Sequence, residues 1–254
     1  MNVWNGKKLT PLSTDPILVI GPEGPLRQAM AREIESLPVP VLVAASLVEA
    51  SNDLPDETRP PSVVLLPEGL IRPDAFEGEL AELRIRMGSP NLVPIAFGRA
   101  PDDARRREIR EAGVELALFG RFGRHALRFQ INRALSPFRA RPVRGELRAP
   151  QEWRTRAYSS SGKPKAMRCY SLSSGGAYFV TPRPWVVGSE IELELPVGHD
   201  RLRIAASVVY THVGDDSARR GLPRGMAVAF RPLSRHIREV IREDVTSTHE
   251  ALEV

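Results

Sequence analysis

The sequence predicts two domains. The first is an N-terminal α/β domain, doubly wound around a five-stranded parallel sheet, and the second is a C-terminal all-β domain, a six-stranded barrel with a C-terminal helix. Three observations predict this division: 254 residues are too many for one ordinary module, short apolar runs alternate with amphipathic stretches in the N-terminal half, and short strands with turn signals follow. The expected boundaries are 15–137 for the first domain, 138–149 for an Arg/Pro-rich linker and 150–254 for the second domain.

The first domain is expected to alternate strands and helices in a regular order. Residues 17–20 (ILVI) form an apolar run that ends at Gly21, which is typical of a buried strand. The helix expected next carries Leu26, Met30 and Ile34 at helical spacing. The other strands are expected at 39–45, 62–66, 91–97 and 114–119, and the helices at 25–37, 46–52, 74–87, 102–112 and 123–135. Strands that each lead into a helix predict a parallel sheet.

The order and length of these elements resemble the receiver domain of response regulators, over about residues 15–137. The resemblance implies a flavodoxin-like sheet with its functional pocket at the carboxyl ends of the strands. Receivers place an acidic pair after the first strand, a phosphoacceptor Asp after the third, a Thr or Ser after the fourth and a Lys after the fifth. In this chain the corresponding positions hold Gly21-Pro22-Glu23, Pro67-Glu68, Gly98-Arg99 and Gly120-Arg121.

None of the receiver residues stands in its place, and this decides what the domain is expected to do. Proline at 67 cannot accept a phosphoryl group, and without two adjacent carboxylates there is no site for Mg²⁺, which needs oxygen ligands. We therefore expect a phosphorylation-independent domain whose helix faces dock a protein partner or a second copy of the chain.

The second domain begins where the helical pattern stops. Pro137 and Pro142 end the preceding helix and favour an extended connection. Strands are expected at 152–159, 166–172, 177–181, 190–195, 201–212 and 226–230, with turn signals between them. The last expected element is a helix over 234–246. Its apolar stripe consists of Ile237, Val240, Ile241 and Val245. This texture predicts a small antiparallel barrel closed by a helix.

Charge is distributed unequally along the chain. Residues 1–120 contain 13 Lys and Arg against 18 Asp and Glu, whereas residues 121–254 contain 23 against 13. The stretch 121–148 alone holds eight arginines and a single acid, Glu146. Such a block attracts an anionic ligand, but it is equally typical of a solvated helix face that continues into a linker.

Two motifs in this half carry a second resemblance. Arg144 and Arg148 form an RxxxR pattern, and 23 residues after Arg148 the run Ser171-Leu-Ser173-Ser-Gly175-Gly176 is similar to a [D/N]xSxxG motif. Two later runs, 187–195 and 225–230, have the pattern of the strands that follow these motifs in the same family. Together and in this order they resemble the PilZ domain, the bacterial receptor module for cyclic di-GMP.

The resemblance implies a ligand site with identifiable chemistry. Arg144 and Arg148 would bind phosphate oxygens and the guanine O6/N7 edge, because a guanidinium can donate two parallel hydrogen bonds to either. Gly175 and Gly176 would let the ligand approach the main chain, and the Ser173 hydroxyl would donate a hydrogen bond. Position 171, where the family has Asp or Asn, holds Ser171. The loss of a charge-assisted contact there costs on the order of 1–3 kcal/mol, or roughly ten- to a hundredfold in affinity.

These observations predict a non-enzymatic signalling effector that binds cyclic di-GMP through its PilZ-like domain and a protein through its receiver-like domain. Ligand binding is expected to order the arginine-rich interdomain segment and change the placement of the two domains. One alternative is an adaptor that has lost ligand binding and acts by protein contacts alone, for example in motility or polarity regulation. Another is nonspecific nucleic-acid binding by residues 121–148; it is disfavoured because only Phe122, Phe129 and Phe138 interrupt the arginines.

Other classes are excluded by what the sequence does not contain. A composition of 42% hydrophobic and 26% charged residues is that of a globular protein, not a disordered one. Cys169 is the only cysteine, so neither an intramolecular disulfide nor a cysteine-based metal site can form. The five histidines are scattered, and no catalytic or cofactor motif is present. Without a signal sequence or a run of about 18 apolar residues, a cytoplasmic protein with no metal, no cofactor and no membrane span is expected.

Overall fold

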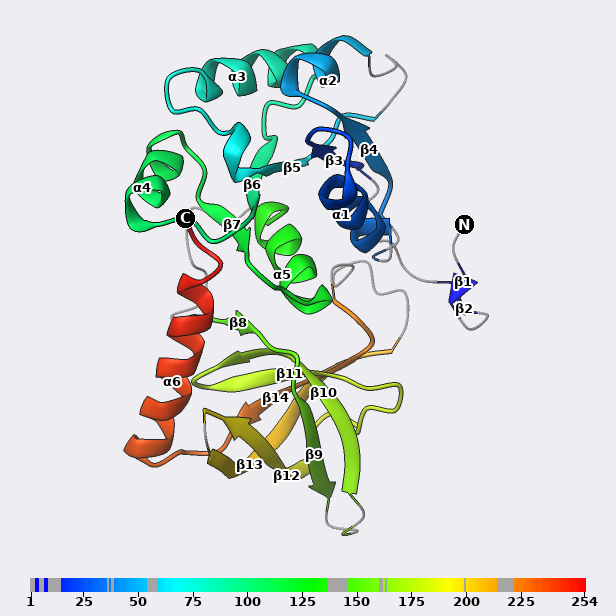
Figure 1. Cartoon of the computed structure of the whole chain (residues 1–254). Coiled ribbons are helices and arrows are strands. Elements are labelled where there is room, and N and C mark those ends of the chain that lie inside the picture. Colours follow the sequence, from blue (N-terminus) through cyan, green and yellow to red (C-terminus); the bar gives the residue numbers. More distant parts are fainter. Residues whose placement is uncertain are drawn as a thin grey trace. The chain divides into compact units, whose positions relative to one another are not determined.

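The computed structural model describes residues 3–4, 7–8, 15–35, 37, 39–53, 59–136, 146–159, 162, 164–198, 200–213 and 222–254 (Figure 1). The chain divides into two compact units. The first comprises Met1–Arg141 together with Ala251–Val254, and the second comprises Pro142–Glu250. The sequence predicts a second domain that runs to residue 254, whereas the last four residues lie with the first compact unit. Most of the expected linker, including Arg144, lies outside the described residues.

The first unit contains the expected parallel sheet. Its strands are β3 (Ile17–Ile20), β4 (Val41–Ala44), β5 (Val63–Pro67), β6 (Val93–Gly98) and β7 (Leu116–Phe119), and its helices are α1 (Pro25–Glu35), α2 (Leu47–Asp53), the short 3₁₀ helix η1 (Glu68–Leu70), α3 (Phe76–Arg86), α4 (Asp103–Glu111) and α5 (Arg124–Ala134). A separate two-stranded ribbon of β1 (Val3–Trp4) and β2 (Lys7–Lys8) precedes them. The sheet order is β4-β3-β5-β6-β7, with every neighbouring pair parallel. In the part of the chain that is described, this is the 2-1-3-4-5 order of doubly wound flavodoxin-like folds.

Both faces of this sheet are buried under helices. Leu18 and Ile20 of β3 belong to the core cluster that includes residues of α2, α3 and α4. Ile17 and Val19, which point to the opposite face, belong to the cluster that includes residues of α1 and α5. Burial on both faces explains why these strands appear in the sequence as continuous apolar runs.

The start of α4 shows how a local signal fixes an element. Asp102 is the N-cap residue, and its side chain accepts a hydrogen bond from the backbone N–H of Arg105 at 2.8 Å. An Asp at this position satisfies one of the free N–H groups of the first turn. The helix expected at 102–112 is therefore confirmed, and its first residue is Asp103.

The second unit is the expected barrel. Its strands are β8 (Ala149–Pro150), β9 (Arg154–Ser159), β10 (Pro164–Ser173), β11 (Gly176–Val180), β12 (Glu190–Val197), β13 (Asp200–His212) and β14 (Gly225–Phe230). Among the residues described for this unit, six strands pair antiparallel around a ring in the order β10-β11-β14-β13-β12-β9, and β9 pairs again with β10. The two-residue β8 adds to β10. The closed ring leaves the six long strands without an open edge.

Helix α6 (Arg235–Glu250) follows the last strand and is longer than the expected 234–246. Its Ile241 and Val245 are buried in the barrel core cluster, against which Trp153 and Trp185 also pack. The expected apolar stripe of this helix therefore faces the barrel. None of the helices in the described residues combines the length and the apolarity of a membrane span.

A bulge in β10 determines which residues face the outside of the barrel. The register with β11 shifts between Cys169 and Ser171. Cys169 and Leu172 lie in the barrel core cluster, so Ser171 and Ser173, on either side of Leu172, are directed to the outer face.

Candidate functional site

The hairpin between β10 and β11 carries four of the six residues that the sequence singled out. The Ser173 hydroxyl donates a hydrogen bond to the Gly176 carbonyl oxygen at 3.2 Å, across the turn. The Gly175 carbonyl oxygen accepts a hydrogen bond from the Phe230 backbone N–H at 2.9 Å, which fastens the turn to β14. Ser171 and Ser173 are only 4% and 2% exposed. The Ser173 hydroxyl therefore stabilises the turn in this structure.

The segment that contains Arg148 runs along this hairpin. In β8, Ala149 pairs with Leu172 and Pro150 pairs with Ser171. At the other end of the segment, the Glu146 carboxylate lies against Gly175, where a Cβ atom would be only 2.6 Å from Glu146 Oε2. Arg148 lies between these two contacts, so the structure brings it to the [D/N]xSxxG-like hairpin. The first residue of the RxxxR pattern, Arg144, lies outside the described residues.

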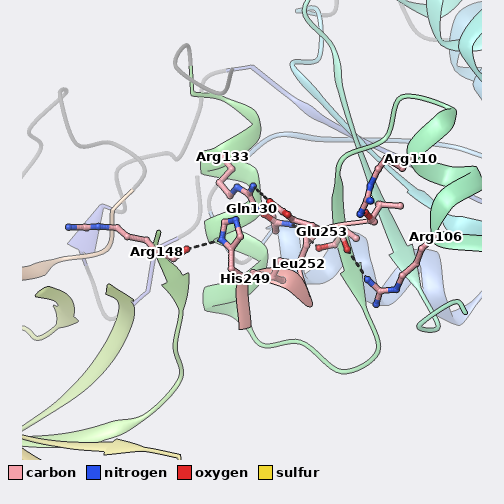
Figure 2. Close-up of polar contacts among 10 residues, drawn as sticks. Arg106, Arg110, Gln130, Arg133, Arg148, His249, Leu252 and Glu253 are labelled. Carbon is pink, nitrogen blue, oxygen red and sulfur yellow. Dashed lines mark hydrogen bonds and ion pairs between the residues drawn. The ribbon is translucent and has the colours of Figure 1, made fainter. Parts of the chain in front are cut away.

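Helix α6 holds the same segment at two points. His249 Nδ1 donates a hydrogen bond to the main-chain oxygen of Arg148 at 3.0 Å (Figure 2). Because a carbonyl oxygen only accepts, Nδ1 carries the proton. Gln151 Nε2 donates to Asp244 Oδ2 at 2.8 Å; burial raises the pKa of Asp244, and this hydrogen bond opposes the rise. The helix thus holds the chain on both sides of β8, through the main chain of Arg148 and through the side chain of Gln151.

Gly176 is required by the packing of the barrel. A Cβ atom on Gly176 would lie 2.3 Å from the main-chain oxygen of Val228 on the neighbouring strand β14. Gly175 is different, because the obstacle there is the end of the Glu146 side chain. The fold therefore requires glycine at 176, whereas Gly175 leaves room for the Glu146 side chain beside the hairpin.

The single cysteine belongs to the barrel interior. Cys169 is completely buried, and burial raises the pKa of its thiol far above the usual range. A thiol that stays protonated is a poor nucleophile and a poor metal ligand. Cys169 is therefore a packing residue.

In the first unit, the side chains of Pro67 and Glu68 lie at the carboxyl edge of the parallel sheet. A Cβ atom on Gly21 would lie 3.2 Å from Pro67 Cγ, and one on Gly98 would lie 2.1 Å from Glu68 Oε2. Arg105 Nη2 donates to the main-chain oxygen of Glu68 at 2.7 Å, which holds η1 in place. Across the described residues, no group of three His, Cys, Asp or Glu side chains gathers as a metal site would require. The side chains of Pro67 and Glu68 occupy the space next to the positions where receivers carry their reactive residues.

Several residues around the Arg148 segment were missed by the sequence analysis as parts of the site. They are Glu146, Gln151, Asp244 and His249. Only Glu146 gave a signal, as the one acid among eight arginines. The others make contacts between α6 and β8 that no local pattern encodes.

The comparisons with known proteins match the two parts of the chain separately. The PilZ domain family matches residues 142–247. No curated protein matches the chain. Among solved structures, the PilZ domain of YcgR from Escherichia coli, determined with c-di-GMP, is 16% identical, with 43% of this chain and 93% of that chain covered and a TM-score of 0.32.

Two further structures are similar to different parts of the chain. The Bacillus subtilis inhibitor of motility MotI/DgrA is 14% identical, with 43% of this chain covered and a TM-score of 0.35, and the chain covers 52%, about half, of that protein. The chemotaxis protein CheY4 of Vibrio cholerae is 16% identical, with 48% of this chain and 100% of that chain covered and a TM-score of 0.40.

The family match and the barrel topology concern the same residues, and the strand order of the first unit is that of receivers. The chain is therefore identified as one that carries a PilZ domain in residues 142–247, preceded by a receiver-like domain without the phosphorylation residues.

Proposed function

We propose that the protein is a non-enzymatic signalling effector whose PilZ domain binds cyclic di-GMP and whose receiver-like domain docks a protein partner without being phosphorylated. The observation that carries the proposal is the pairing of the Arg148 segment with the hairpin at Ser171–Gly176, through β8. Arg148 and Ser171 are 23 residues apart, yet the described part of the Arg148 segment runs beside the hairpin.

The proposed site residues have distinct roles. Arg144 and Arg148 would supply guanidinium groups to the phosphates and the guanine edges of the ligand. Gly175 would leave the main chain accessible, whereas Ser173 and Gly176 shape the turn. Glu146, whose carboxylate now lies on Gly175, would have to move aside for an anionic ligand, because like charges repel.

Calorimetric titration of the full chain with cyclic di-GMP tests ligand binding. We expect saturable heat at micromolar concentrations, and much weaker binding of the linear dinucleotide pGpG, which has the same bases but is not pre-organised as a ring. No heat with cyclic di-GMP, from protein that melts cooperatively, would contradict the proposal.

A second candidate function is an adaptor that binds no cyclic dinucleotide. It is favoured by Ser171, which is nearly buried and stands where the family has Asp or Asn, and by the carboxylate of Glu146 beside the hairpin. The same titration separates the two functions, because the adaptor gives no heat with either dinucleotide.

Phosphorylation independence makes its own prediction. After incubation with acetyl phosphate and Mg²⁺, the intact mass spectrum of the protein should show no phosphorylated species, because Pro67 has no acceptor group and Glu68 fills the space beside Gly98. The Pro67→Asp variant should also stay unmodified, since the acidic pair and the Lys of receivers are absent. A genuine receiver treated in parallel serves as the positive control, and phosphorylation of the wild-type chain would refute this part.

A further inference from the structure

The four residues that follow α6 lie along the outer edge of β7. Glu253 forms an antiparallel bridge with Leu116. The backbone N–H of Ala117 donates to the Leu252 carbonyl oxygen at 2.9 Å, and the N–H of Val254 donates to the Glu115 carbonyl oxygen at 3.2 Å. Since β7 pairs with β6 on its other side, these residues extend the sheet of the first unit by a short antiparallel strand.

Side chains from α4 and α5 complete the hydrogen bonding of this strand (Figure 2). Gln130, which is 0% exposed, donates from Nε2 to the carbonyl oxygens of Ala117 at 2.8 Å and Leu252 at 2.5 Å. Arg106 Nη1 donates to the Glu253 carbonyl oxygen at 3.0 Å, and Arg110 donates to the main-chain oxygen of Val254. The main-chain oxygens of residues 252–254 therefore each receive a side-chain donor.

The side chains of residues 252–254 also make specific contacts with the first unit. Arg133 Nη2 pairs with Glu253 Oε1 at 2.9 Å. Leu252 is buried in the core cluster of α1 and α5, and Val254, 1% exposed, in the cluster of α2, α3 and α4. The edge thus accepts an apolar, an acidic and an apolar residue in succession.

We propose that this edge of β7, with Gln130 of α5 and the arginines of α4 and α5, is a docking site for an extended segment of a partner protein in which an acidic residue stands between two apolar ones. Residues 251–254 occupy the site in cis. The proposal rests on the part of the proposed function in which the receiver-like domain docks a protein partner. It does not depend on cyclic di-GMP binding, because every contact that carries it lies in the first unit.

The cis strand is suited to being displaced. Two main-chain hydrogen bonds, which make up one isolated bridge, join it to β7. The contacts of Gln130, the arginines and the two apolar side chains add to these, but the segment is only four residues long, so its local opening costs less than unfolding the domain. Opening leaves an unpaired strand edge, the buried amide of Gln130 and three guanidinium groups. An unpaired edge recruits an extended chain by strand addition, and the cations favour an acidic one.

Fluorescence polarisation with a labelled peptide of residues 247–254 (STHEALEV) tests the site. The chain truncated after Glu250 should bind this peptide at least tenfold more tightly than the full chain, in which the cis strand competes at high effective concentration (~mM). In the truncated chain, Arg133→Glu should weaken binding by roughly three- to tenfold, and a peptide carrying Glu253→Arg should restore it. Arg107→Glu changes an exposed residue of α4 that is not one of the side-chain donors to this strand and should leave the affinity unchanged.

Equal affinity of the full and truncated chains, or no restoration by the charge swap, would overturn the proposal. If truncation prevents folding, hydrogen exchange on the full wild-type chain decides, because the Ala117 amide donates to Leu252. We expect this amide to exchange well before those of the central strand β5. If it exchanges only when the whole domain unfolds, residues 251–254 are a permanent strand of the sheet and the proposal is wrong. A dimer of the full chain that disappears on truncation would make a second copy the occupant in place of a partner.

Discussion

Gly176→Ala is expected to lower the free energy of unfolding of the PilZ domain by roughly 1–3 kcal/mol or more. The new Cβ atom would lie 2.3 Å from the main-chain oxygen of Val228, a separation that no relaxed structure tolerates. Gly176 pairs with Ala229 in the ladder between β11 and β14. Because the obstacle is backbone and not a flexible side chain, the two strands must separate, and this ladder is one of the six that close the barrel.

Urea denaturation followed by tryptophan fluorescence measures this loss, since Trp153 and Trp185 pack against the barrel core. Gly78→Ala is the matched control. Gly78 lies within α3 of the first unit, no atom comes within 4 Å of the added Cβ, and its φ is not positive, so alanine there should leave the unfolding transition of the barrel, which these tryptophans follow, unchanged. Wild-type stability of Gly176→Ala would mean that β11 and β14 are not paired as described.

The sequence predicted the fold class because its signals are local and repeated. β3 matches the expected 17–20, and each of the six barrel strands overlaps its expected range, with ends that coincide or differ by one or two residues. Apolar periodicity, Gly and Pro turn signals and the Asp102 cap encode such elements without reference to the rest of the chain. Strand ends were less well predicted, since the last pair of a ladder depends on the partner strand.

The strand at 251–254 shows what local signals cannot encode. Leu252 and Val254 are too few for a periodic pattern, and their partner, β7, lies more than a hundred residues earlier in the sequence. The hydrogen bonds from Gln130 and Arg106 to this strand likewise join residues that are more than a hundred positions apart in the sequence. Pairing over such distances becomes visible only in three dimensions.

The candidate site could be predicted only in part, because some of its contacts join residues that are distant in the sequence. The two motifs gave Arg148 and the glycines, and the structure places them side by side. It also shows that the Ser173 hydroxyl is engaged within the turn, which the sequence left open. Direct ligand contact by Ser171 and Ser173 stays a prediction.

Arg148→Ala is expected to reduce the affinity for cyclic di-GMP roughly ten- to a hundredfold, because a hydrogen bond to a charged group contributes about 1.5–3 kcal/mol. The fold should survive this change. His249 donates to the main-chain oxygen of Arg148, and β8 pairs through main-chain atoms, so both contacts persist with alanine at this position. An unchanged melting temperature would show that the lost affinity comes from the guanidinium itself.

Two further variants separate recognition from general attraction. Arg201→Ala removes the same charge from an exposed position on β13 of the same domain and should change the calorimetric affinity by less than about twofold, because surface charges are screened in physiological salt. Arg148→Lys keeps the charge but loses the planar pair of donors, so its affinity should fall between those of wild type and Arg148→Ala. If Arg201→Ala and Arg148→Ala weaken binding equally, the ligand is bound by general electrostatic attraction to the positively charged domain. The Arg148 segment beside the hairpin is then not its specific site.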